Sequence, residues 1–161
     1  MKTFTLAALC FVVFSAFAQK ADFTGNWVFV EQESISGNLY SNGSPKQINI
    51  SQTATVVNLD KITMGANNTD FTVSEKLTKD GRAVELTTAS KRKKTITTTW
   101  SNDGNSFVCF TTISSPDDAG KLERKVTDTY SLEYGSLILQ RKDENLTNGE
   151  VWESKAVYER R

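Results

Sequence analysis

The sequence predicts an all-β protein, a single antiparallel up-and-down β-barrel of about 8–10 strands. Short runs of Thr, Val, Ile and aromatic residues recur along the chain, and helix signals are few. Turn sequences separate these runs at regular spacing, and two of them, residues 79–82 and 102–105, centre on Asp-Gly, which suits the positive φ of a tight hairpin. The only two prolines, Pro45 and Pro116, fall between the runs, outside interior strands.

Ten segments of the chain read as strands. Short turns between consecutive segments favour an antiparallel meander, and closing it into a barrel removes the exposed edges. The expected strands cover residues 24–33, 46–52, 54–62, 70–78, 83–91, 93–101, 106–114, 121–133, 136–143 and 150–160.

The first 18 residues have the layout of a secretory signal peptide: a charged start, an apolar run and an Ala-x-Ala site ending at Ala18. The apolar run is shorter than the roughly 20 residues of a membrane span. A buried N-terminal strand or helix, and lipidation of Cys10, are weaker alternatives, since Leu9 stands where a lipobox needs a small residue. We therefore expect a signal peptide over 1–18, a barrel domain over 19–161, and an exported protein, periplasmic or secreted.

The remaining chain is nearly neutral. Cleavage removes only Lys2 among the charged residues, leaving 18 Lys and Arg against 19 Asp and Glu, which argues against nucleic acid as a partner. No later segment is apolar enough for a membrane span, and a monomer is expected. Cys109 is then the only cysteine, so no intramolecular disulfide is possible, and its strand-like context predicts a small buried side chain.

The residue types disfavour an enzyme. The chain has no histidine, so it lacks the commonest general base and metal ligand, and no Ser-His-Asp or Cys-His arrangement can exist. We expect no catalytic residues, no metal site and no cofactor. The paired carboxylates at 117–118 and 143–144 are expected in turns, where solvation explains them.

Alternation along the last strand predicts which side chains face the barrel interior. Trp152, Ser154, Ala156 and Tyr158 share one face with Arg160. Trp152 and Tyr158 are the predicted ligand-binding residues, because an aromatic ring with a polar group suits an amphipathic ligand.

Three further features leave alternatives open. Asp128 is expected at a strand end or facing outward near Lys125, or else inward, paired with Arg160 or Arg141. The basic run 91–94 is expected in a solvated hairpin turn, or alternatively on a patch for a membrane surface or an acidic partner. The polar segment Ser34–Lys46 is either a mobile surface loop or a lid over a cavity.

Two motifs carry a family resemblance. Phe23-Thr24-Gly25-Asn26-Trp27 resembles the opening of the calycin superfamily, which includes lipocalins and intracellular fatty-acid-binding proteins, and Lys155-Ala156-Val157-Tyr158-Glu159-Arg160 looks like the last strand of the latter. The chain from residue 22 to 160 resembles the small exported lipocalin-like proteins of Bacteroidetes. The resemblance implies a lipocalin-like barrel in which Gly25, Trp27 and Arg160 are structural, with Arg160 packed on the Trp27 ring at the barrel base.

The sequence departs from the fatty-acid-binding pattern at one position. That family holds a carboxylate with Arg-x-Tyr on the last strand; Tyr158 matches the tyrosine, but Ala156 stands in place of the arginine. The long helical lid of that family has no counterpart in Ser34–Lys46. We therefore expect a barrel that binds a small apolar or amphipathic molecule. The alternative is a filled, non-catalytic barrel with a structural or protein-interaction role in the cell envelope.

Overall fold

In a computed structural model the chain forms a nearly closed barrel of ten antiparallel strands, and the structure describes residues 21–36 and 44–161. The predicted signal peptide and residues 37–43 of the predicted loop lie outside the described residues. The described residues contain one short 3₁₀ helix, η1 (Ala66–Asn68), and no α-helix. The strands are β1 (Gly25–Ser36), β2 (Gln47–Gln52), β3 (Val56–Met64), β4 (Asp70–Thr78), β5 (Val84–Thr87), β6 (Lys93–Trp100), β7 (Ser106–Ser114), β8 (Leu122–Glu133), β9 (Ser136–Asn145) and β10 (Val151–Arg160).

The strands follow one another round a single sheet. Their order is β4-β3-β2-β1-β10-β9-β8-β7-β6-β5, so the first and last strands pair and close the barrel. Consecutive strands are hydrogen-bonded to each other except β4 and β5, which form the two ends of the sheet and leave the barrel open between them. This confirms the predicted up-and-down barrel. No helix among the described residues is long and apolar enough to cross a membrane.

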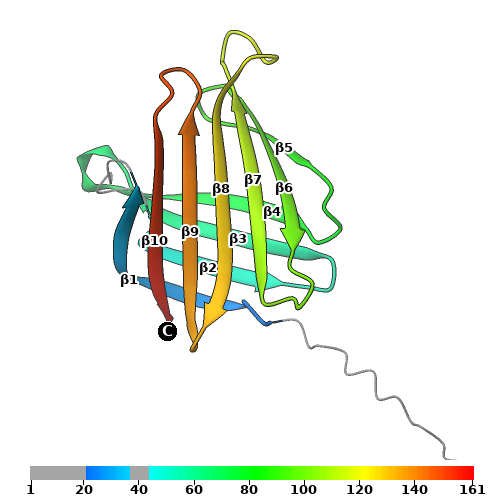
Figure 1. The fold of residues 1–161 in the computed structure, drawn as a ribbon, viewed down its shortest axis with the longest axis vertical. Coiled ribbons are helices and arrows are strands. Elements are labelled where there is room, and N and C mark those ends of the chain that lie inside the picture. Colours follow the sequence, from blue (N-terminus) through cyan, green and yellow to red (C-terminus); the bar gives the residue numbers. More distant parts are fainter. Residues whose placement is uncertain (1–20, 37–43) are drawn as a thin grey trace, which may run out of the picture.

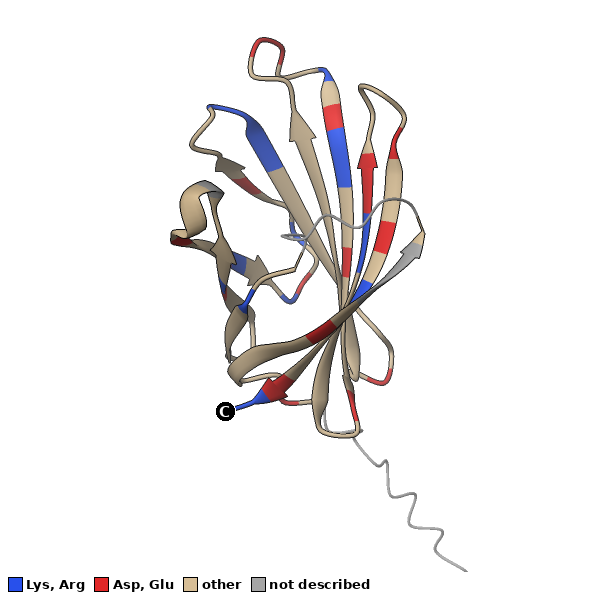
Figure 2. Cartoon of the chain, turned by 90° about the vertical axis from the view of Figure 1, so that its left-hand side faces the viewer, with Lys and Arg blue, Asp and Glu red and all other residues tan. Residues whose placement is uncertain are grey.

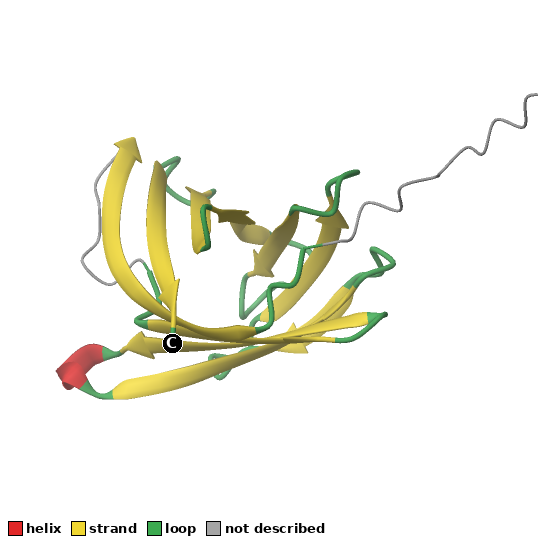
Figure 3. Ribbon diagram, turned by 90° about the horizontal axis from the view of Figure 1, so that it is seen from below, coloured by secondary structure: helices red, strands yellow, loops and turns green. Residues whose placement is uncertain are grey.

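The sheet curves until its two halves face each other. Figure 1 shows strands β8, β9 and β10 in front, crossing β2, β3 and β4 behind them at a steep angle. Seen from below, the strands surround a common interior (Figure 3). Side chains on the concave face of one half therefore meet those of the other half.

Period-two alternation explains which residues fill this interior. On β10 the inward residues Trp152, Ser154, Ala156 and Tyr158 are all buried, which confirms the predicted facing of this strand. The lower end of the barrel is filled by an aromatic group that includes edge-to-face and stacked rings; its members are Phe23, Trp100, Phe107 and Tyr130. Their burial supplies much of the apolar stabilisation of the fold.

Turn chemistry sets where the strands end. Gly81 and Gly104 adopt the positive φ predicted for the two Asp-Gly turns. The expected strand 83–91 is too long, because β5 ends at Thr87 and a turn follows it. In that turn the Thr88 and Lys91 backbones are hydrogen-bonded to Arg92 and Thr88, respectively, and Lys91 has a φ of 60°.

Candidate functional site

Five charged side chains come together inside the barrel. They share the inward face of their strands with buried apolar residues: on β3, for example, the lysine follows Val57 and Leu59 in the same phase. Figure 2 shows that charged residues occur along the strands as well as at the turns. We call the five residues the interior charge network: Lys61 (β3), Glu75 (β4), Lys94 (β6), Asp128 (β8) and Arg141 (β9).

The network is continuous across the barrel. Arg141 donates from Nε and Nη2 to the two carboxylate oxygens of Asp128, at 2.6 and 2.7 Å. Lys61 Nζ lies 4.0 Å from Asp128 Oδ2 and 2.6 Å from Glu75 Oε2. Lys94 Nζ donates to the other oxygen of Glu75. The contacts therefore link β9 to β8, β8 to β3 on the facing half of the sheet, and β4 to β6 beside the opening of the barrel.

Both carboxylates of the network are buried and stay ionised. Burial by itself raises the pKa of Asp128. Arg141 and then Lys61 lower it by more than burial raises it, so the pKa lies below its usual 3.8. Burial likewise raises the pKa of Glu75, and Lys61 and Lys94 together bring it below 4.5. For Arg141, burial opposes the charged form, but Asp128 outweighs it, so the pKa rises and the guanidinium stays charged.

The charges of the network do not balance. Within the five side chains of the network, all from the described part of the chain, three cations (Lys61, Lys94 and Arg141) face two carboxylates, so the net charge of the network is +1. An uncompensated charge in a buried site is costly, and an anion placed beside it relieves that cost. The network is therefore suited to hold one negatively charged group.

A buried hydroxyl group lies beside the network. The Tyr130 ring stacks on Phe107 with centroids 4.7 Å apart, and its hydroxyl group has no hydrogen-bond partner among the described residues. Burial, followed by the charges of Asp128, Cys109 and Glu75, raises the pKa of Tyr130 well above its usual value. The hydroxyl group therefore keeps its proton and can donate a hydrogen bond to a bound molecule.

Cys109 faces the same interior layer but offers no reactive group. Burial raises the pKa of its thiol to about 12. Lys61 opposes this rise, and the nearby carboxylates of Asp128 and Glu75 add to it. The thiol is therefore protonated at neutral pH and a poor nucleophile. In the part of the chain that the structure describes, no three His, Cys, Asp or Glu side chains gather as a metal site requires.

The two predicted ligand-binding residues lie at different levels of β10. Trp152 is at the end near the turn between β9 and β10 and lines a pocket of about 480 Å³. Tyr158 is fully buried towards the other end, and its ring meets that of Phe29 edge-on at 5.8 Å. Burial raises its pKa, against the effect of Arg141. Both side chains face inward, and the structure does not bring them together in one pocket.

The three residues predicted to be structural lie together at the barrel base. The Arg160 guanidinium carbon lies 4.7 Å from the centroid of the Trp27 ring, and Trp27 Nε1 donates to the carbonyl oxygen of Phe23 at 2.8 Å. Gly25 makes room for this stack, because a Cβ there would lie 3.0 Å from Arg160 Nε. Arg160 also donates to the carbonyl oxygen of Asp22 at 3.1 Å, which fixes the segment that enters β1.

Three expectations about polar residues need correction. Asp128 is not at a strand end or facing outward; it faces inward and pairs with Arg141, the alternative that sequence left open. Asp143 is not in a solvated turn but is buried on β9, where Arg124 neutralises it. Lys94 is not in a solvated turn but on β6, where its side chain points inward to Glu75.

Sequence reasoning did not single out Lys61 and Glu75. Lys61 is in phase with Val57 and Leu59, and Glu75 is in phase with Leu77, so strict alternation places both inward. A charged residue at an inward position is the signal that identifies them. An arginine does lie close to Ala156, but on the neighbouring strand β9. Arg141 is opposite Ser154, which is one inward position along β10 from Ala156.

The fold is a lipocalin-like, or calycin-like, β-barrel. The chain is similar to the ileal bile acid-binding protein of zebrafish, solved in complex with cholic acid, with a TM-score of 0.53 and 17% identity over 86% of this chain and 98% of that chain. It also resembles the fatty-acid-binding protein of Manduca sexta, with a TM-score of 0.49 and 17% identity over 86% of this chain and 99% of that chain. No family model and no curated protein sequence matches the chain.

Proposed function

We propose that the protein binds a small amphipathic molecule that carries one negative charge, with the charged group at the interior charge network. The surplus positive charge of that network is the observation that carries the proposal, since one buried and two partly buried cations face two buried carboxylates. The Tyr130 hydroxyl group adds a donor that has no acceptor among the described residues. A carboxylate is a suitable group, because it accepts hydrogen bonds both from the cations of the network and from the Tyr130 hydroxyl group.

Apolar side chains with accessible surface favour a ligand that also has an apolar part. Phe29 faces inward opposite Tyr158, yet 37% of its surface is exposed. Phe71 lies on the same face of β4 as Glu75 and is 49% exposed. Inward-facing rings that keep this much accessible surface leave room for apolar contact with a ligand. Tyr158 and Trp152 remain proposed ligand contacts, at the network and at the upper end of β10, respectively.

The comparison with solved structures supports a lipophilic ligand in general terms. The zebrafish protein of the same fold was solved with cholic acid. We extend the proposal to a monomeric, non-enzymatic binder of the lipocalin-like type. We also propose that it is exported, because the first 18 residues have the layout of a signal peptide. N-terminal sequencing of the protein recovered from outside the cytoplasm tests export: Gln19 is expected as the first residue, and an intact Met1 in that fraction contradicts it.

Calorimetric titration with dodecanoate and dodecanol tests the proposed ligand class. The two probes share an apolar chain and differ in charge. We expect dodecanoate to bind at least about tenfold more tightly than dodecanol, because only the carboxylate neutralises the surplus charge. Equal affinities, or no binding of either probe, would overturn the proposal, and the latter result would favour a filled barrel.

A matched pair of variants locates the effect. Lys61→Met removes one cation of the network, so the preference for dodecanoate over dodecanol should largely disappear. Lys125→Met makes the same change on the outward face of β8, outside the network, and should leave the preference intact. Near-ultraviolet circular dichroism of both variants verifies that the barrel is folded. A preference that survives Lys61→Met in a folded barrel contradicts the proposed location.

A further inference from the structure

A second polar pocket lies at one end of the barrel, apart from the interior charge network. It has a volume of about 480 Å³, within the usual range of small-molecule sites. Its walls come from the upper ends of β8, β9 and β10 in Figure 1 and from the turn before β6. We call it the upper pocket, and none of its residues belongs to the network: Arg92, Glu123, Arg124, Asp143, Asn145, Thr147, Glu150 and Trp152.

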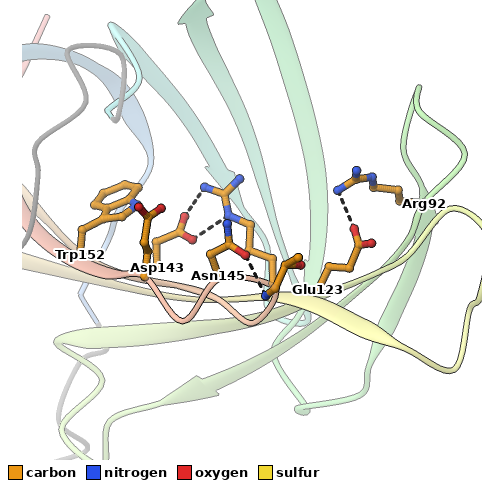
Figure 4. Close-up of a pocket in the computed structure, with 8 residues that line it drawn as sticks. Arg92, Glu123, Asp143, Asn145 and Trp152 are labelled. Carbon is orange, nitrogen blue, oxygen red and sulfur yellow. Dashed lines mark hydrogen bonds and ion pairs between the residues drawn. The ribbon is translucent and has the colours of Figure 1, made fainter.

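Four of the five charged side chains in the upper pocket are paired with each other, and Glu150 is the fifth. Arg124 donates from Nε to Asp143 Oδ1 at 2.6 Å and from Nη2 to the other oxygen, and Asp143 is only 2% exposed. On the far side, Arg92 Nη1 lies 3.0 Å from Glu123 Oε2. Figure 4 shows the two pairs following one another along the pocket wall. An anionic ligand would be repelled by Glu150, and a strongly charged ligand of either sign would have to compete with the two pairs, so a ligand without net charge fits the pocket.

The same groups retain capacity for further hydrogen bonds. A guanidinium carries five N–H donors, and the bonds to Asp143 use Nε and one Nη2 proton of Arg124. The side chain of Asn145 accepts from the backbone N–H of Thr147 through Oδ1, at 2.9 Å, and its amide group carries two further donors. The Glu150 carboxylate and Thr147 hydroxyl group add acceptors. The wall therefore presents both donors and acceptors, and the ion pair with Asp143 holds Arg124 in position.

Trp152 supplies an apolar surface to this polar wall. It is 9% exposed and lines the pocket beside Asp143, the residue opposite it on β9. A ligand with C–H groups next to hydroxyl groups can use both kinds of surface at once. Saccharides have this chemistry: they are uncharged, carry many hydroxyl groups that both donate and accept, and present C–H groups along the ring.

We propose that the upper pocket binds a neutral saccharide, as a free sugar or as the head of a larger molecule. The hydroxyl groups hydrogen-bond to Arg124, Asn145 and Glu150, and the ring contacts the part of Trp152 that lines the pocket. The proposal does not rest on the proposed function: the two share Trp152 as a contact, but the hydrogen-bonding groups of the upper pocket lie outside the interior charge network and the ligand has a different charge.

Titration of the isotope-labelled protein with sugars, followed by nuclear magnetic resonance, tests this site. The probes are glucose, galactose, maltose and lactose, with the charged relatives glucuronate and glucosamine as comparisons. We expect at least one neutral sugar to shift the indole N–H signal of Trp152 in a saturable way, with a dissociation constant below about 10 mM. The indole signals of Trp27 and Trp100, which lie towards the other end of the barrel, should stay unchanged.

Two substitutions and a control assign the binding to the upper pocket. Asn145→Ala and Thr147→Val should each weaken binding of the neutral sugar at least about threefold, since each removes hydrogen-bonding groups. Glu153→Gln, on the same strand as Trp152 but on its outward face, should leave binding unchanged. An unchanged pattern of the Trp27 and Trp100 signals verifies that the variants are folded.

Three results would overturn the proposal. One is the absence of a saturable shift with every neutral sugar up to about 50 mM, far above the expected dissociation constant. Another is binding of glucuronate or glucosamine alone, which would make the pocket a site for an ion. The third is neutral-sugar binding that Asn145→Ala and Thr147→Val both leave intact. Dodecanoate binding without sugar binding rejects this proposal and leaves the proposed function standing. Sugar binding without dodecanoate binding supports this proposal and rejects the proposed function.

Discussion

Asp128 and Arg141 show how a single buried pair shapes this barrel. Arg141 donates two hydrogen bonds to the carboxylate of Asp128, which is buried in the barrel interior. A buried ion pair contributes modestly as a pair, because desolvation offsets most of the attraction, but either partner left alone is strongly destabilising. The structural importance of these residues therefore lies in their being present together.

Asp128→Asn tests this dependence on the partner. The change leaves the buried guanidinium of Arg141 without its anion, so we expect the free energy of unfolding to fall by about 3–5 kcal/mol. The double variant Asp128→Leu with Arg141→Met should lose less than the single variant. Urea unfolding of the parent protein and the two variants measures both effects, and a double variant that loses as much stability as Asp128→Asn, or more, would contradict the pairing.

The pH dependence of stability follows from the same carboxylates. The pKa values of Asp128 and Glu75 are lowered in the folded protein from their usual 3.8 and 4.5. Their contribution to stability is therefore complete above those values and is lost as the pH falls through the lower folded values. We expect the free energy of unfolding to decrease steadily below about pH 4.5, and urea unfolding between pH 7 and pH 3 measures it.

The matched variant for this prediction is Glu75→Gln. Removing the titrating carboxyl group should make the loss of stability towards acid pH shallower than in the parent protein. A parent protein whose stability is constant from pH 7 to pH 3, or a variant with the same acid dependence as the parent, would show that these carboxylates are not stabilised in the folded barrel.

Cys109 provides an independent measure of interior burial. Its thiol has a pKa raised to about 12 by burial, so very little thiolate is present at pH 8. We expect a thiol reagent such as Ellman's reagent to react with it at least about a hundredfold more slowly in the folded protein than in 6 M urea. Equal rates in the two conditions would mean that solvent reaches the interior layer.

At the scale of the elements, local sequence determines most of what is seen. Alternation and turn residues place all ten strands, because each depends on neighbours only a few positions away. The strand expected at 83–91 is cut short because Thr88 and Arg92 close a turn that apolar patterning does not reveal. The inward position of Lys94 follows from its phase with Ile96, a signal that the solvated-turn interpretation of residues 91–94 overlooked.

The contact between β1 and β10 at the barrel base depends on a glycine. Gly25 has a φ of 156°, and an added Cβ would lie 3.0 Å from Arg160 Nε and 3.4 Å from Trp27 Nε1. Gly25→Ala should displace the guanidinium from the indole ring and lower the free energy of unfolding by about 1–3 kcal/mol. Urea unfolding measures the loss, and Gly149→Ala, where the added Cβ meets nothing within 4 Å, is the control for backbone strain alone.

At the scale of the whole molecule, the site is assembled from strands that lie far apart in the sequence. Lys61 reaches Asp128 across the interior, and Glu75 reaches Lys94 beside the opening of the barrel. Alternation shows that each of these residues faces inward, but it does not show which cation meets which carboxylate. That pairing depends on the curvature and stagger of the closed sheet, which no local pattern encodes.

The same reasoning separates what could be predicted about the ligand from what could not. The sequence indicates a barrel with an interior, and it places Trp152 and Tyr158 on the inward face. The absence of an arginine at Ala156 argues against the carboxylate clamp of fatty-acid-binding proteins. Only the assembled barrel brings Arg141, Lys61 and Lys94 to two carboxylates and creates the surplus positive charge on which the proposed function rests.

The most direct test of that surplus charge is the carbon-13 signal of carboxyl-labelled dodecanoate bound to the protein, followed from pH 8 to pH 4. A carboxylate held beside the network should stay ionised below the range in which a solvated carboxylic acid takes up its proton, about pH 4–5. Its signal should therefore stay nearly constant over the titration. A bound carboxyl group that titrates like the free acid, or at a higher pH, would contradict a positively charged interior site.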